Sequence, residues 1–262
     1  MKNRLIHRST AAVQQGGHVT EWSAAKQVIK RKVTRLTARV GAALLIVGAT
    51  SAPAAPVPAN APPAKQILAM ARLQQARQDV DLKGQLRQND LIIPFRLTQS
   101  GGVTRYSFTN PDEALQLRLG DADSKLEEIT REGVDKISGP EFEQRVRGTP
   151  VTFEDLALKF LYWPNAKVVS DDYINTRRVW KIELEPPGHQ SQYSRVLAWT
   201  EQQSGALMRI EGYDRNGKLA KRFEVVSVQT IAGRIYLKQM RIEALQPETG
   251  KVQSRTYLEI KR

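Results

Sequence analysis

Hydrophobic and polar residues alternate one by one along most of the second half of the chain, which is the spacing of β-strands with one buried face. In residues 177–186, Trp180 and Ile182 share one face, and charged residues occupy the positions between and after them. Asn216-Gly217 separates two further alternating segments, and this dipeptide is a strong signal for a β-hairpin. The pattern therefore predicts consecutive strands joined by tight turns.

The first half repeats the pattern less regularly. The stretches LIIPFRLTQ and VTRYSFTN flank Ser100-Gly101-Gly102 and predict a hairpin, and 115–119 and 124–132 predict two more strands. Residues 133–150 hold several Gly and Pro and predict a loop. In all, about ten antiparallel strands with one apolar face are expected, and such a sheet must cover that face. The fold class is mainly β (α+β), a strongly curved antiparallel sheet that forms an incomplete β-barrel.

Two segments have helical spacing instead. In residues 65–78, Ile67, Met70, Leu73 and Ala76 recur every three residues and predict a short amphipathic helix.

The second helix is expected over residues 152–161, in the stretch TFEDLALKFLYWP. Its apolar positions form one stripe, namely Phe153, Leu156, Ala157, Phe160 and Leu161. Thr152 suits the N-cap and Pro164 ends the segment, whereas Glu154 and Lys159 are expected to face water. So short a helix is marginal without packing, and we expect its hold on the sheet to be loose.

Two helices are too few to fill the hollow of so wide a sheet, and this predicts an apolar cavity between sheet and helices. The candidate lining residues come from the second helix and from the apolar faces of the C-terminal strands: Phe153, Leu156, Phe160, Leu161, Trp180, Ile182, Met208, Ile210, Met240 and Ile242. Tyr162 and Trp163, at the end of the helix, fit either the core or the ligand surface.

The beginning of the chain has the composition of an export signal. Basic residues over 30–39 precede a short apolar run over 40–50, and Ala52 and Ala54 form an A-x-A pattern that places the mature start at Ala55. An uncleaved membrane anchor is the alternative. The expected organisation is a signal peptide over 1–54, a Pro/Ala-rich tether over 55–64 and one domain over 65–262, in a protein that is soluble in the periplasm after cleavage.

Charge and composition exclude several function classes. The formal charge is +13, but residues 1–54 carry nine basic and one acidic side chain, so only +5 remains for the rest, with signs interleaved. We therefore expect no nucleic-acid partner. The chain has no Cys and three His, which are too few ligands to predict a zinc site. It contains no P-loop and no GxGxxG motif, so no cofactor is expected.

No residue pattern indicates catalysis. His189 lies in a predicted turn, Asp171-Asp172 precedes a predicted strand, and Glu141 and Glu143 lie in a predicted loop, where solvated side chains are the simpler interpretation. No catalytic residue is assigned, and the sequence does not indicate an enzyme.

The blocks GTPVTFEDLALKFLYWPNAKV, RRVWKIELEPP and YSRVLAWTEQQSGALMRIEGYDRNGKLAKRFEV, with MRIEAL and SRTYLEI, resemble the LolA-like outer-membrane lipoprotein-sorting proteins. The resemblance covers roughly residues 82–262. It implies an incomplete barrel with a helical lid, and a monomeric periplasmic carrier of lipoprotein acyl chains or lipid. Such a carrier takes its cargo from an inner-membrane loading complex to an outer-membrane acceptor. An envelope-stress sensor or protein-interaction module on the same fold, and a hydrolase with an unusual site, are the alternatives.

Overall fold

The computed structural model describes residues 58–261. The predicted signal peptide and the first residues of the predicted tether therefore lie outside the described part of the chain.

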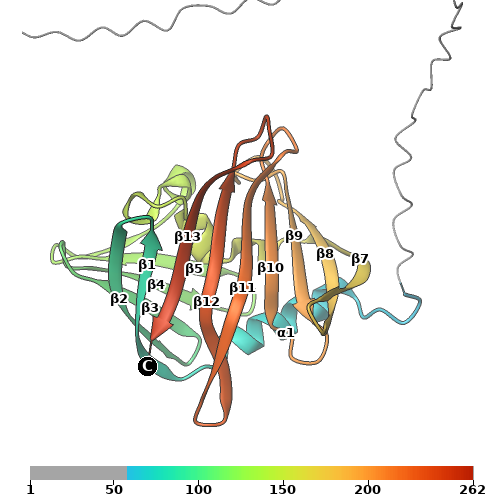
Figure 1. The fold of residues 1–262 in the computed structure, drawn as a ribbon, viewed down its shortest axis with the longest axis horizontal. Helices are drawn as coiled ribbons and strands as arrows, with labels where there is room; N and C mark the ends of the chain where they lie inside the picture. Colours follow the sequence, from blue (N-terminus) through green and yellow to red (C-terminus); the bar gives the residue numbers. More distant parts are fainter. Residues whose placement is uncertain (1–57, 262) are drawn as a thin grey trace, which may run out of the picture. The chain divides into compact units, whose positions relative to one another are not determined.

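The described elements follow one another in a simple order (Figure 1). They are α1 (Ala64–Ala76), β1 (Val80–Gln88), β2 (Leu91–Ser100), β3 (Val103–Phe108), β4 (Glu113–Leu119), β5 (Ser124–Ile129), β6 (Val134–Lys136), the 3-10 helices η1 (Gly139–Glu143) and η2 (Val146–Gly148), α2 (Phe153–Ala157), the 3-10 helix η3 (Lys159–Tyr162), β7 (Asn165–Ile174), β8 (Arg177–Glu185), β9 (Arg195–Glu201), β10 (Leu207–Tyr213), β11 (Leu219–Ile231), β12 (Arg234–Leu245) and β13 (Val252–Lys261).

All thirteen strands belong to one antiparallel sheet, in the order β6-β5-β4-β3-β2-β1-β13-β12-β11-β10-β9-β8-β7. The last strand, β13, pairs with both β1 and β12, so it joins an N-terminal meander to a C-terminal one. The two ends of the sheet, β6 and β7, do not pair with each other, and the sheet stays open. The predicted class, a mainly β protein with an incomplete antiparallel barrel, is confirmed.

Three strands were missing from the sequence prediction. β1 holds Gly84 at its centre, β7 contains the Asp171-Asp172 pair, and β6 is three exposed residues long inside the segment 133–150 that was predicted as a loop. The acidic pair therefore lies within a strand, where Asp171 pairs with Arg178 on β8 and Asp172 accepts a hydrogen bond from the indole of Trp199.

Helix α1 packs its apolar face against β7 and η3. The buried residues are Ala64, Ile67, Leu68 and Ala71, whereas Met70 and Leu73 are exposed, so the predicted repeat of three is wrong for these two. An α-helix has 3.6 residues per turn, and a strict repeat of three drifts off the buried face within a few turns.

The second helix is shorter than predicted. Thr152 caps α2 as expected, and its hydroxyl accepts from the amide of Asp155. The α-helix ends after Ala157, because Leu158 takes a left-handed conformation with φ of 51°, and a 3-10 turn follows.

Contacts with a distant turn accompany this break. Lys159 Nζ donates to the carboxylate of Asp123 and to the carbonyl of Ser124, and the Tyr162 hydroxyl donates to the carbonyl of Gly120. The turn between β4 and β5 therefore holds η3. Lys159 is also not the free, water-facing lysine that was expected.

One face of the sheet packs against α1, α2 and η3 and forms the main core, while the opposite face carries ion pairs across the strands. Glu243 on β12 illustrates this second face: its side chain is 6% exposed and lies within salt-bridge distance of Arg222, Arg241 and Arg255. A smaller apolar cluster of Ile174, Val179, Leu197 and Trp199 lies outside the main core.

Candidate functional site

A cavity of about 950 Å³ lies between the apolar face of the sheet, the C-terminal end of α1 and the α2–η3 segment. This volume is at the upper end of the range of small-molecule pockets, about 300–1,000 Å³. Residues from both meanders line the cavity, and most are aliphatic or aromatic. The hollow predicted from the shortage of helices is therefore present.

The structure brings together six of the ten predicted lining residues at the cavity: Leu156, Phe160, Met208, Ile210, Met240 and Ile242. The other four do not line it. Phe153, Leu161 and Ile182 are buried in the main core, and Trp180 packs against that core while partly exposed.

Tyr162 and Trp163 do not border the cavity either. Trp163 is buried in the main core. The Tyr162 ring lies under the guanidinium of Arg72, at 4.9 Å from Cζ to the ring centroid. Of the two possibilities for these aromatic residues, the structure places both in packing.

The N-terminal meander supplies much of the wall, which the sequence prediction missed. Leu86, Phe95, Tyr106, Phe108 and Leu117 project from β1 to β4 into the lining. Phe95 meets Tyr106 and Phe108 edge to face, with centroids 5.6 and 5.9 Å away. Burial raises the pKa of Tyr106 to about 12, as expected for a phenol that lines an apolar space.

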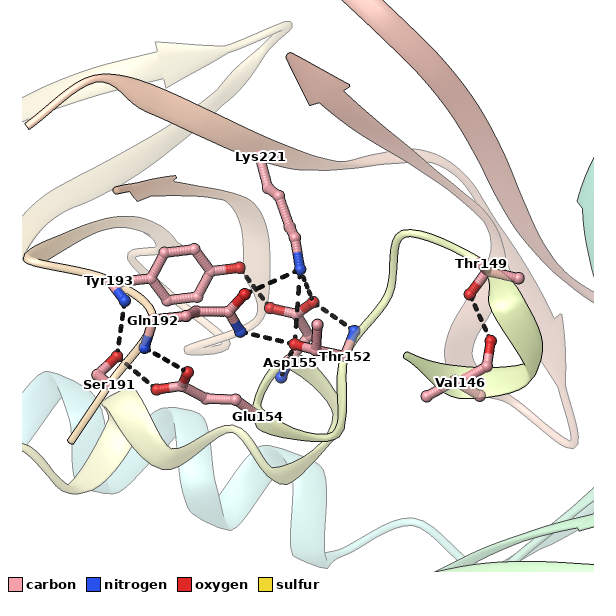
Figure 2. Close-up of polar contacts among 9 residues, drawn as sticks. All are labelled: Val146, Thr149, Thr152, Glu154, Asp155, Ser191, Gln192, Tyr193 and Lys221. Atoms are coloured by element: carbon pink, nitrogen blue, oxygen red, sulfur yellow. Dashed lines mark hydrogen bonds and ion pairs between the residues drawn. The ribbon is translucent and has the colours of Figure 1, made fainter. Parts of the chain in front are cut away.

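Helix α2 closes one end of the cavity, and a polar network fixes it there (Figure 2). Lys221 Nζ reaches from β11 to the carboxylate of Asp155 at 2.7 Å, and the two side chains are 11% and 2% exposed. Asp155 also accepts from the amide of Thr152 at 2.8 Å and from the hydroxyl of Tyr193.

Glu154 is the second anchor, and the expectation that it faces water is wrong. The residue is only 7% exposed, and its carboxylate accepts from the hydroxyl of Ser191 and from the amide of Gln192 at 3.0 Å. Burial raises the pKa of Glu154, although these hydrogen bonds oppose the shift. Both acidic residues of α2 therefore accept hydrogen bonds from the loop between β8 and β9.

The other carboxylates considered for chemistry have structural partners. Glu141 accepts from the amide of Ser138, and Glu143 pairs with Arg215. His189 is exposed in the loop after β8. Within residues 58–261, no group of three His, Asp or Glu side chains is placed to hold a metal ion.

The protein was compared with known families and structures. A model of a family of uncharacterized proteins matches residues 130–262, just over half of the chain. The chain belongs to this family. No curated protein sequence matches the chain.

The fold of this chain is similar to those of three solved structures. A putative outer membrane lipoprotein-sorting protein domain from Vibrio parahaemolyticus is 16% identical, with a TM-score of 0.58 over 76% of this chain and 92% of that one. A DUF1329 family protein from Desulfovibrio piger is 19% identical, with a TM-score of 0.57 over 77% and 92%. A LolA superfamily protein from Nitrosomonas europaea is 18% identical, with a TM-score of 0.55 over 77% and 93%. The fold of this protein is LolA-like.

No helix of this LolA-like protein within residues 58–261 is both long and apolar enough to cross a membrane.

Proposed function

We propose that this LolA-like protein is a carrier or binder of acylated ligands in the cell envelope, with the acyl chain held in the cavity. The apolar cavity of about 950 Å³ is the observation that carries the proposal. The export signal predicted over residues 1–54 and the similarity in fold to a lipoprotein-sorting domain support the periplasm as the compartment.

Burial of hydrocarbon alone can supply the affinity. Each buried CH₂ contributes about 0.8 kcal/mol, so about ten methylenes contribute about 8 kcal/mol, which corresponds to a Kd of roughly 1 µM. The ligand needs no reacting group on the protein, and an acyl chain of a lipoprotein or of a lipid meets the requirement. Loading at the inner membrane and delivery to an outer-membrane acceptor are the transport steps that such a carrier would serve.

The direct test is to purify the protein from the envelope without detergent and to identify bound lipids by mass spectrometry. We expect acylated molecules in stoichiometric amount. Protein that is well folded and free of lipid, but is recovered with one defined protein partner, would favour the sensor or interaction module instead.

Leu156→Glu tests the cavity in the same preparation. Leu156 lines the cavity and is partly buried, so a carboxylate there should abolish lipid recovery while folding persists. Leu91→Glu is the matched control, because Leu91 is 48% exposed and is not among the lining residues. Equal lipid content in the two variants would remove the cavity from the binding site.

A further inference from the structure

Most arginine side chains in the described part of the chain are paired, but four are not. Residues 58–261 contain eighteen arginines. Fourteen of these side chains form hydrogen bonds, many of them to carboxylates. The four without a hydrogen bond or salt bridge are Arg77, Arg145, Arg177 and Arg234, and all except Arg145 line the cavity.

These three arginines lie at one end of the sheet. Arg177 closes the β7–β8 hairpin opposite Ile174, and Arg234 closes the β11–β12 hairpin opposite Ile231. In an antiparallel meander these two hairpins lie at the same end. Arg77 ends α1 just before β1, which starts at this end beside the last residues of β13. Figure 1 shows the β11–β12 hairpin and the last turn of α1 at the lower end of the molecule.

The cavity lining is exposed to solvent at this end. The three arginines are exposed, whereas the salt bridge between Asp155 of α2 and Lys221 of β11 lies at the opposite end of the cavity. The lining is therefore apolar in its depth and cationic at its mouth.

Of the two carboxylates in the lining, only Glu201 lies near these arginines, and it forms no salt bridge with them. Asp155 forms a salt bridge with Lys221 at the other end of the cavity. Glu201 is buried near the mouth and accepts hydrogen bonds from Ser204 N and Oγ, both at 2.6 Å. Burial raises the pKa of Glu201, but the hydrogen bonds from Ser204 and the charge of Arg177 outweigh it, so its pKa lies below the usual value.

We infer that the mouth binds the anionic head of an amphiphile whose acyl chain fills the cavity, with Arg77, Arg177 and Arg234 as the head-group ligands. This inference rests on the proposed function and narrows its ligand class. Guanidinium groups bind carboxylates and phosphates through paired N–H donors, so a fatty acid and a lysophospholipid share the required chemistry. The lipid portion of a lipoprotein carries no such charge next to its chains.

The experiment measures displacement of a neutral fluorescent reporter, N-phenylnaphthylamine, from the full chain. The competitors are palmitate, methyl palmitate and a palmitoyl lysophosphatidic acid, at a pH at which both acids are ionised. The variants are Arg77→Gln, Arg177→Gln, Arg234→Gln and the triple variant. Arg145→Gln is the matched control, because Arg145 is also exposed and unpaired but lies outside the cavity lining.

The wild-type protein should bind the anionic competitors at least about tenfold more tightly than the ester, since each of the three exposed arginines contributes roughly a twofold to fivefold effect. The triple variant should lose this preference and keep its affinity for methyl palmitate, and Arg145→Gln should change nothing. The preference should also shrink as salt is added. Tighter binding of lysophosphatidic acid than of palmitate would assign the mouth to phosphate, and the reverse order to carboxylate.

An unchanged preference in the triple variant would overturn the inference while leaving the proposed function intact. A second measurement compares the binding of the wild-type protein and the triple variant to phosphatidylglycerol vesicles. If the triple variant loses only vesicle binding, the arginines contact the membrane surface and the inference is also overturned. Failure of both palmitate and its ester to displace the reporter would overturn the proposed function as well.

Discussion

The ion pair between Asp155 and Lys221 should be the most costly polar contact to break in the described structure. The two atoms are 2.7 Å apart, and the side chains are 2% and 11% exposed. Asp155→Asn removes the negative charge and leaves the buried ammonium of Lys221 with neutral acceptors only, namely the new amide oxygen, Gln192 Oε1 at 3.2 Å and Thr152 Oγ1 at 3.5 Å. Removing one partner of a buried pair costs about 3–5 kcal/mol.

Lys221→Met should cost less, about 2–3 kcal/mol, because Asp155 keeps its hydrogen bonds from the Thr152 amide and the Tyr193 hydroxyl. The double variant removes both charges together. It should therefore be more stable than the sum of the single effects predicts, by roughly 1–3 kcal/mol.

Urea unfolding followed by tryptophan fluorescence gives these values, and thermal melts should show a loss of about 6–12 °C for a change of about 3 kcal/mol. The control is the pair of Arg131 and Asp112, which is equally short at 2.6 Å but has side chains 83% and 55% exposed. Arg131→Met should cost less than about 1 kcal/mol. Equal losses of stability at the two pairs, or additive effects of Asp155→Asn and Lys221→Met, would show that the buried ion pair does not stabilise the fold as proposed.

Three further variants test other parts of the account. Burial raises the pKa of Glu154 above its ordinary 4.5, so the stabilisation present below that value is lost as pH rises through the folded pKa. Glu154→Gln should remove this decline in stability. Thermal melts of the two proteins between about pH 4 and 8 should therefore converge in acid. Parallel curves would show that Glu154 does not titrate in this range. Gly212→Ala should cost about 1–3 kcal/mol, because a Cβ there would lie 2.3 Å from the ring of Tyr193, which Asp155 holds; a neutral effect in urea unfolding would mean that the ring can move. Gly84→Ala should also destabilise, through the ring of Phe95 at 2.4 Å, and its reporter affinity should fall if that ring moves into the cavity.

Much of the sheet could be predicted because its strands carry their own signal. In β8, β12 and β13, apolar and polar side chains alternate, and Asn216-Gly217 marks the turn between β10 and β11. β1 shows the same alternation, with Val80, Leu82 and Leu86 on one face, but Gly84 interrupts that apolar face and the strand was missed. It becomes a central strand because β2 and β13 pair with it on both sides, and Gly84 leaves room for the ring of Phe95.

The predicted length of the second helix and the predicted exposure of Glu154 and Lys159 were wrong because of contacts with distant segments. A glutamate on a short helix ordinarily faces water, but Glu154 is buried because Ser191 and Gln192 provide donors from a distant loop. Leu158 breaks the helix in a conformation that its own sequence disfavours, and contacts of Lys159 with the β4–β5 turn accompany the break. Contacts of this kind link segments far apart in sequence, so local spacing does not reveal them.

The candidate site was predicted in part. The strand faces that supply Ile210, Met240 and Ile242 were evident from alternation. Ile182 has the same alternation but lies in the closed core, because burial on the apolar face is the same signal for a packed residue and for a cavity wall. The arginines of the mouth carry no sequence signal, since only the structure shows which arginines lack partners.

The dependence of affinity on acyl chain length shows whether the hydrocarbon of the ligand lies in the apolar cavity. A series of fatty acid methyl esters, measured by displacement of the neutral reporter, removes the head-group charge from the comparison. If the chain enters the apolar cavity, each added CH₂ should contribute about 0.8 kcal/mol, an increase in affinity of about fourfold, until the cavity is full. An affinity that does not change with chain length would contradict the account, because it would place the hydrocarbon outside the cavity.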